Sequence, residues 1–186
     1  MNTFYKIKSA FLSWFSDIRF YKGGIILFGD SHYELKGPDI RAIINHLQPG
    51  DIMLRRYNHY LGSVFIPGYW SHMALYLGDN TVIHMLGEGV TKEDILTFTR
   101  ADDLCILRAR DPELIEYALI KAENIYCKHI EYDYNFDFED GTKMSCTELG
   151  LICFNYPPFN SRSNKKMVLP DDYLDSIFDI VWKKGN

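Results

Sequence analysis

The sequence predicts an α+β fold in which an antiparallel sheet packs against helices. Several short segments alternate apolar and polar residues, as strands do, and longer segments carry apolar residues at helical spacing. A turn signal, Asp79-Asn80, joins two of the expected strands directly, which is typical of antiparallel neighbours. A chain of 186 residues fits one domain and can bury a sizeable core without disulfide bonds.

The first part of the chain predicts two helices and a short strand. Apolar residues recur at helical spacing over 4–18, and a pair of glycines then breaks the pattern. Residues 25–29 follow as a short strand. A proline opens a second helix over 38–47, and Pro49-Gly50 closes it.

The remaining elements follow from the same patterns. Alternating apolar residues predict strands, turn residues separate them, and helical spacing marks one long helix. In chain order we expect strands at 51–56, 71–78, 81–86 and 104–110, a helix over 112–130, a strand or hairpin at 132–143, a helix from Cys146 and a short helix from Pro170, after which the apolar segment 179–182 ends the chain.

Composition narrows the classes of protein to consider. The net charge of −5 argues against a general nucleic-acid-binding protein. The N-terminal apolar residues are interrupted too often for a secretory signal, and no apolar stretch is long enough to span a bilayer. The four cysteines form no C-x-x-C pair, so reduced thiols and a cytoplasmic location are expected.

The expected helix over 4–18 is amphipathic, which allows two interpretations. Phenylalanine, tryptophan and isoleucine side chains share one face, and lysines lie between them. The helix can pack on the rest of the domain. Alternatively, residues 1–22 can make a peripheral contact with a membrane surface.

The most informative residue is Cys146, because the residues around it mark a helix N-terminus. Ser145 and Glu148 form an S-x-x-E capping box, which predicts Cys146 at the first helical position. Backbone N–H groups and the helix dipole favour a thiolate there. A thiolate beside an imidazole is a nucleophile and base pair suited to acyl transfer.

Two histidines on the expected hairpin could supply that imidazole. A three-residue loop over 78–80 would pair Ala74 with His84 and would place His72 and His84 on one face as diagonal neighbours. A two-residue loop would place them on opposite faces, unless a bulge restores the register. The hypothesis of a Cys–His–His triad therefore requires the first register or a bulge.

Given that register, each residue has an expected role. Cys146 attacks a carbonyl, His72 acts as base and later protonates the leaving group, and His84 orients His72. The Cys146 backbone N–H is one candidate oxyanion donor, and a tyrosine hydroxyl is the second. Residues expected to support this centre are Tyr132, Tyr134, Ser145 and Glu88.

Aromatic residues directly before His72 suggest one wall of a substrate cleft, although plain core packing is an equal alternative. These residues are Phe65, Tyr69 and Trp70. We expect no metal and no cofactor. The acidic residues over 133–139 lack the glycine and glutamate of a calcium loop, and the capping box favours a nucleophile over a zinc ligand at Cys146.

The chain also resembles a known family. The segments PGDIMLRR, YWSHMALYLGDNTVIHMLGEGV, YDYNFDFEDGTKMSCTELG and LPDDYLDSIFDIVW occur in this order between Leu47 and Trp182. They resemble the permuted papain-like cysteine hydrolases, in particular the YiiX branch of the NlpC-type amidases, a group related in fold to lecithin:retinol acyltransferase. In that family the histidine strand precedes the nucleophile helix, as it does here.

The resemblance implies a fold, an activity and site residues. It implies a single circularly permuted papain-like domain over 1–186, with 1–46 as a helical or irregular N-terminal extension. It also implies Cys146 as nucleophile and His72 as base, with His84 at the third position and Glu88 as its competitor.

Three functions are then open. The first is a cysteine hydrolase that cleaves an amide bond in a small peptide-like or N-acyl substrate; the amide preference comes from the resemblance. The second is a lipid-directed acyl hydrolase or acyltransferase, which the amphipathic helix and the aromatic residues would suit. The third is a non-catalytic binding module. The sequence makes no prediction of oligomeric state.

Overall fold

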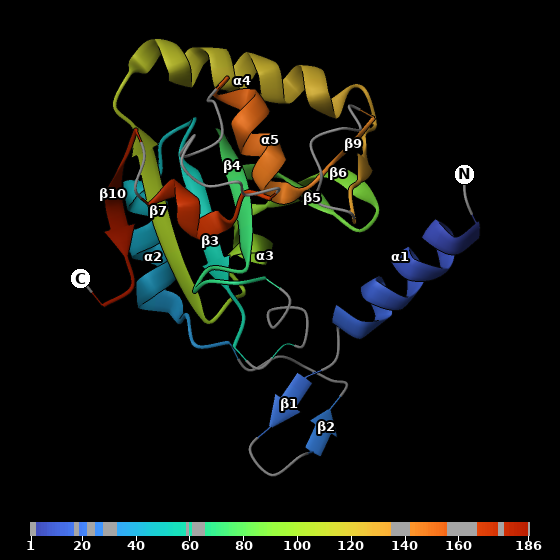
Figure 1. The fold of residues 1–186 in the computed structure, drawn as a ribbon. Helices are drawn as coiled ribbons and strands as arrows, with labels where there is room; N and C mark the ends of the chain where they lie inside the picture. The colour runs from blue at the N-terminus through green and yellow to red at the C-terminus, as the bar shows by residue number, and fades with distance from the viewer. Residues whose placement is uncertain are drawn as a thin grey trace.

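A computed structural model of the chain describes residues 3–16, 19–21, 25–27, 33–58, 60, 66–134, 142–155, 167–174 and 177–185. At its centre is a six-stranded sheet in which every neighbouring pair is antiparallel, in the order β10-β7-β3-β4-β5-β6 (Figure 1). The strands are β3 (Ile52–Arg56), β4 (His72–Gly78), β5 (Thr81–Leu86), β6 (Gly89–Asp94), β7 (Asp103–Ala109) and β10 (Phe178–Lys183).

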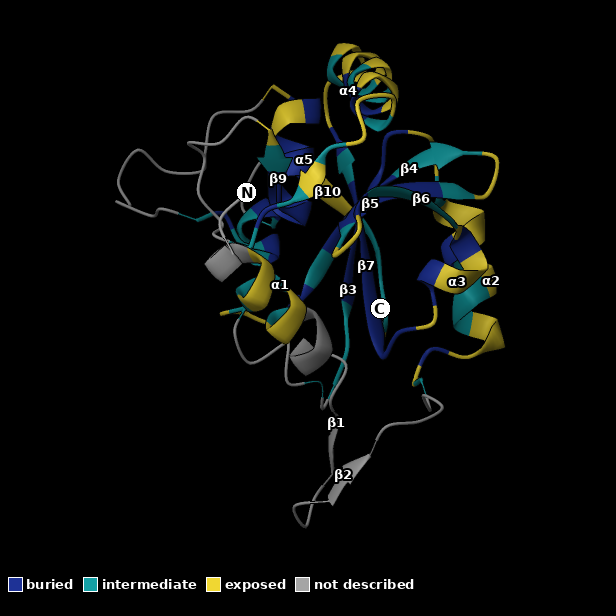
Figure 2. Cartoon of the chain, turned by 90° about the vertical axis from the view of Figure 1, so that its right-hand side faces the viewer, coloured by how far each residue is buried: buried dark blue, intermediate teal, exposed yellow. Residues whose placement is uncertain are grey.

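Helices cover both faces of this sheet (Figure 2). On one face lie α4 (Pro112–Tyr126) and α5 (Cys146–Cys153), and on the other lie α2 (Gly37–His46) and α3 (Ile95–Phe98). The expected α+β architecture, an antiparallel sheet packed against helices, is therefore confirmed.

Smaller elements complete the fold. They are α1 (Thr3–Ser16), the hairpin of β1 (Arg19–Tyr21) and β2 (Ile25–Leu27), the parallel pair of β8 (Glu131–Tyr132) and β9 (Lys143–Met144), and the 3₁₀ turn η2 (Pro170–Tyr173). Figure 1 shows α1 and the β1–β2 hairpin standing apart from the sheet and its helices. None of the helices in the described part of the chain is long and apolar enough to cross a membrane.

Strand alternation divides the buried side chains into two clusters, one on each face of the sheet. Met73 and Leu75 of β4 pack toward α4 and α5, whereas Ala74 packs toward α2 and α3. The second cluster includes Ile43 of α2 and Phe98 of α3, both fully buried. Each face of the central strands is therefore a separate environment, and neighbouring residues on β4 belong to different ones.

The β4–β5 hairpin has the register that the sequence analysis required. Asp79 and Asn80 both adopt positive φ, as a tight two-residue turn demands, and Leu77 forms a bulge. The bulge restores the pairing of Ala74 with His84. The prediction that His72 and His84 share a face is therefore confirmed, through a two-residue turn with a bulge in place of a three-residue loop.

Several elements of the described structure were not expected from the sequence, namely β1, β6, β10 and α3. Strand β6 carries a single large apolar residue, Val90, and α3 is only four residues long. Edge strands often carry charged residues in place of alternating apolar ones, so the apolar spacing in the sequence does not predict β6. Most of the strand or hairpin expected at 132–143 lies outside the described residues, and its two ends pair in parallel as β8 and β9.

Candidate active site

Helix α5 begins as the sequence predicts. The Ser145 hydroxyl accepts a hydrogen bond from the Glu148 backbone N–H at 3.3 Å, and the Glu148 carboxylate accepts one from the Ser145 N–H at 2.5 Å. This capping box satisfies two amides at the helix start and makes Cys146 the first helical residue. The sulfur of Cys146 consequently lies at the positive end of α5.

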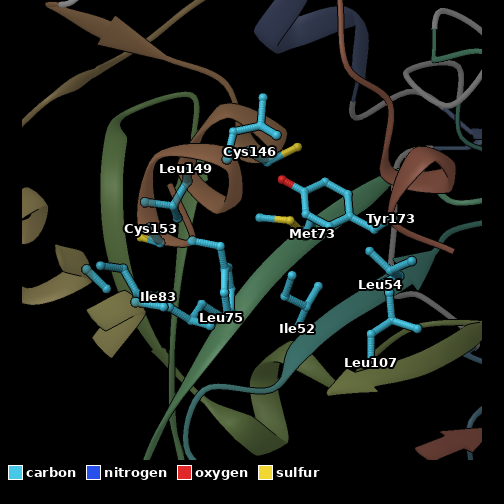
Figure 3. Close-up of a cluster of buried hydrophobic side chains, with 14 of the residues drawn as sticks. Ile52, Leu54, Met73, Leu75, Ile83, Leu107, Cys146, Leu149, Cys153 and Tyr173 are labelled. Carbon is cyan, nitrogen blue, oxygen red and sulfur yellow. The ribbon is translucent and has the colours of Figure 1, made fainter. Parts of the chain in front are cut away.

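The Cys146 side chain is buried rather than open, with 5% of its surface exposed. In Figure 3 its sulfur points toward Tyr173 and Met73, above the face of the sheet that carries Leu54 and Leu75. The Tyr173 hydroxyl donates to the Thr147 carbonyl at 2.7 Å and so ties η2 to the first turn of α5.

Burial raises the pKa of the Cys146 thiol to about 11, although three backbone N–H groups and the Arg55 charge act to lower it. These N–H groups belong to Met73, Thr147 and Cys146 itself. The helix N-terminus favours a thiolate, as the sequence predicts, but desolvation opposes it more strongly.

The Met73 N–H reaches the sulfur because the β4–β5 ladder ends beside it. The Tyr76 N–H donates to Asp51 on the β3 side, so alternate amides of β4, including that of Met73, face β5. The β4–β5 register, however, stops at Ala74 and His84. The next amide, Met73, is then available to the thiol, which places the sulfur at the backbone of β4 one residue from His72.

His72 and His84 form the imidazole pair that the hairpin predicts. The His72 Nε2 and His84 Nδ1 atoms are 3.0 Å apart, and both rings pack against Phe98 of α3. Burial, the Arg55 charge and the other imidazole hold the pKa of His72 well below 6.5. Burial and Arg55 lower the pKa of His84 to about 3. Both rings are therefore neutral at physiological pH.

The Cys146 side chain lies on one face of the sheet, and the imidazole rings of His72 and His84 lie on the other. Cys146 packs in the cluster under α4 and α5, whereas both rings contact Phe98, which belongs to the cluster under α2 and α3. In the described part of the chain no hydrogen bond joins Cys146 to His72. The Met73 amide is the feature that brings the sulfur close to the histidine strand.

The supporting tyrosines lie on the thiol side. Burial raises the pKa of Tyr132 well above 10, and Cys146 is the largest charged contributor after burial. The Tyr132 and Tyr134 ring centroids are 4.8 Å apart. Tyr132 is thus close to the sulfur and stays a neutral phenol, able to donate a hydrogen bond.

The aromatic residues before His72 differ in exposure. Trp70 is 1% exposed and belongs to the core, so for this residue the alternative of core packing holds and the cleft assignment is corrected. Tyr69 is exposed and could line a cleft. Asp171 of η2 accepts the N–H groups of both residues at 2.9 and 2.8 Å and so fixes the approach to β4. Phe65 lies outside the described residues.

A charged pair that the sequence analysis missed lies beside the imidazoles. Glu93 of β6 has an oxygen 3.7 Å from His84 Nε2, and the same oxygen is 3.7 Å from an Arg55 nitrogen. Glu88, the expected competitor, occupies the exposed β5–β6 turn. Had β6 been recognised, antiparallel pairing from that turn would have placed Glu93 diagonally across from His84.

Arg55 is buried under the same site. Its guanidinium lies 4.2 Å from the Phe98 ring centroid and 5.0 Å from that of Tyr57, and it donates to the Phe98 carbonyl at 3.3 Å. Among the described residues, no group of three or more histidine, cysteine, aspartate or glutamate side chains could hold a metal ion.

Comparisons with known proteins agree with the fold. The family model of the permuted papain-like amidase enzymes, YaeF/YiiX (C92 family), matches residues 46–171. The crystal structure of the metalloprotein YiiX from Escherichia coli O157:H7 is similar in fold, with a TM-score of 0.58 at 14% identity, over 75% of this chain and 98% of that chain. No curated protein sequence matches the chain. The match over more than half of the sequence shows that the chain belongs to the permuted papain-like amidase family.

Proposed function

We propose that this chain is a cysteine amidase that cleaves an amide bond through an acyl-thioester on Cys146, with His72 as general base. One observation carries the proposal. Cys146 is the first residue of α5, where backbone N–H groups of Met73, Thr147 and Cys146 act to lower the pKa of its thiol, and Met73 is the chain neighbour of His72 in a neutral imidazole pair. Membership of an amidase family supports the amide preference.

The pKa values favour proton transfer during attack over a resting ion pair. With the thiol pKa near 11 and His72 neutral, Cys146 would lose its proton to His72 as the sulfur attacks the carbonyl carbon. Nδ1 of His72 is the acceptor, because Nε2 already faces His84. Contacts between nucleophile and base are commonly long before substrate binds. Because Cys146 and His72 lie on opposite sides of the sheet in the structure, this step requires a rearrangement that brings the sulfur to Nδ1.

The remaining steps use the same groups. Backbone N–H groups at the start of α5, together with the Tyr132 hydroxyl, would stabilise the oxyanion. The tetrahedral intermediate then collapses, the C–N bond breaks, and the amine leaves with the proton from His72. Water attacks the thioester, gives a proton to His72, and the C–S bond breaks to release the carboxylate and restore the thiol.

The direct test measures hydrolysis of N-acyl and short peptide amides by the full chain and by Cys146→Ser. We expect turnover by the wild-type chain and loss of at least a thousandfold in the variant. A covalent acyl adduct on Cys146, detected by mass spectrometry after rapid acid quench, would identify the intermediate. Turnover that survives Cys146→Ser would contradict the assignment of the nucleophile.

A second candidate, a lipid-directed acyl hydrolase or acyltransferase, is favoured by one observation. The apolar side chains of Ile7 and Phe11 on α1 are 65% and 54% exposed, and Lys6 is exposed beside them. Assaying phospholipid and N-acyl amine substrates beside the peptide amides, with vesicles present, separates the two functions.

A further inference from the structure

We propose that Glu93 is a positioning residue that fixes the tautomers of both imidazoles and leaves Nδ1 of His72 free to accept a proton. Its consequence for catalysis rests on the proposed function, but the tautomers can be measured without any activity.

Strand β6 delivers Glu93 to the imidazoles through its register. His84 on β5 pairs with Thr91, and Val82 pairs with Glu93, so Glu93 is diagonal to His84 on the same face of the sheet. The β5–β6 register is regular over all six pairs. The position of Glu93 is therefore set by the backbone ladder and does not depend on a loop.

Three buried polar atoms meet at this point. They are Arg55 Nε, His84 Nε2 and Glu93 Oε2, and within the described structure none of them has a hydrogen-bond partner. Glu93 Oε2 is 3.7 Å from His84 Nε2 and 3.7 Å from Arg55 Nη1. Buried polar atoms interact strongly through charge even where no hydrogen bond forms. The Glu93 carboxylate therefore lies beside the unpartnered His84 Nε2, and the Arg55 charge is close enough to lower the pKa of that ring.

A neutral imidazole pair joined by one hydrogen bond has two arrangements. In the first, His72 Nε2–H donates to His84 Nδ1, so His84 carries its proton on Nε2 and His72 Nδ1 is bare. In the second, His84 Nδ1–H donates to His72 Nε2, and His72 then carries its proton on Nδ1. Only the first arrangement lets His72 Nδ1 act as a base.

Glu93 selects between the two arrangements. A carboxylate 3.7 Å from His84 Nε2 favours an N–H at that atom and so favours the first arrangement. Burial raises the pKa of Glu93, whereas Arg55 lowers it and favours the ionised form. Arg55 is in turn held by the Phe98 carbonyl and the Phe98 ring. Arg55 thus favours an ionised Glu93 carboxylate beside His84, although burial opposes it.

The test is the tautomeric state of the two rings, observed by two-bond ¹H–¹⁵N correlation spectra of the full chain labelled with ¹⁵N-histidine. We expect His72 and His84 both as Nε2–H tautomers in the wild type at neutral pH. In Glu93→Gln the amide can present either a donor or an acceptor to His84. The variant should therefore populate the Nδ1–H tautomer of both rings.

Two results overturn the proposal. The first is that both rings of the wild type are Nδ1–H tautomers. This result would contradict the proposal even if the Glu93→Gln variant does not fold. The other is a folded Glu93→Gln variant whose tautomers equal those of the wild type. The matched control is Glu123→Gln, which removes an exposed carboxylate paired with Lys92 of the same strand. It should leave both tautomers unchanged.

The kinetic constants provide a second measurement, which a purely structural role of Glu93 would not change in the same way. Glu93→Gln should lower kcat at least tenfold and leave KM unchanged, because Glu93 acts through His84 and does not touch substrate. In a His72→Ala background the same substitution should not slow Cys146 alkylation further. Equal slowing in both backgrounds overturns the positioning role. Absence of hydrolysis by the wild type would remove the proposed function and leave the tautomer assignment standing.

Discussion

At Cys146 two physical effects oppose each other. The start of α5 and three backbone N–H groups favour a thiolate, and burial disfavours it more strongly, so the pKa rises to about 11. The sequence could predict the first effect, because a capping box is a local pattern. It could not predict the second, because desolvation depends on Tyr173, Met73 and other residues that the fold brings together.

The imidazole pair makes stability depend on pH, and the sign follows from the lowered pKa values. His84 titrates near 6.5 when unfolded and at about 3 when folded, so between these values the unfolded chain binds more protons. The unfolding free energy should fall as pH falls below 6.5, by up to about 1.4 kcal/mol per pH unit for each such histidine.

Urea unfolding of the wild type and of His84→Gln, measured from pH 7.5 to pH 4.5, checks this dependence. The slope against pH should be shallower in the variant below pH 6.5, and the two slopes should agree above pH 7. Parallel curves over the whole range would contradict the burial of a neutral His84.

At the scale of elements, the sequence predicts those with a strong periodic pattern and misses those without one. Strands β3, β4, β5 and β7 and helices α2, α4 and α5 lie where the sequence patterns place them, whereas β10 was not predicted. Strand β6 has the sequence GVTKED, which reads as a polar loop. Only pairing with β5 makes it a strand. Because Glu93 lies on β6, missing the strand also meant missing this part of the site.

Asp51, directly before β3, should be important for the stability of the sheet. Its carboxylate is fully buried and accepts from Arg108 Nε and Nη2 at 2.8 and 2.7 Å and from the Gln48 N–H at 2.8 Å. Removing it leaves the Arg108 charge without its partner. Asp51→Ala should therefore lower the unfolding free energy by about 3 kcal/mol, the lower end of the range for buried pairs, because Arg108 is partly exposed.

The control for this prediction is Asp179→Ala. Asp179 of β10 pairs with Arg110, which directly follows β7, but both side chains are largely exposed. Such a pair contributes little in water, so the variant should unfold at nearly the wild-type denaturant concentration. Similar losses in the two variants would show that burial of Asp51 does not determine its contribution.

At the scale of the whole molecule, the family match and the core coincide over most of the chain. The matched residues 46–171 contain β3 to β9, α3 to α5 and the candidate catalytic residues Cys146, His72 and His84. Helix α1 and the β1–β2 hairpin precede this region. The sequence predicts α1 from its own periodicity, but the partner of its apolar face cannot be predicted, because no segment of the core requires it.

We predict that α1 binds the surface of anionic vesicles through Ile7 and Phe11. Apolar residues on one face, with Lys6 and Lys8 between them, suit the interface of a negatively charged bilayer. The full chain should co-sediment with vesicles containing phosphatidylserine, and a chain lacking residues 1–22 should not. The variant with Ile7→Glu and Phe11→Glu should behave like the truncated chain. Equal sedimentation of all three would exclude a membrane contact through α1.

The most direct test of the central claim is the rate at which iodoacetamide alkylates Cys146 at pH 7 in the wild type and in His72→Ala. Cys127 is exposed and serves as an internal reference for ordinary thiol reactivity. General-base assistance by His72 should make Cys146 react roughly a hundredfold faster in the wild type than in the variant, with Cys127 unchanged. Equal rates at Cys146 in the two proteins would contradict the pairing of this thiol with His72.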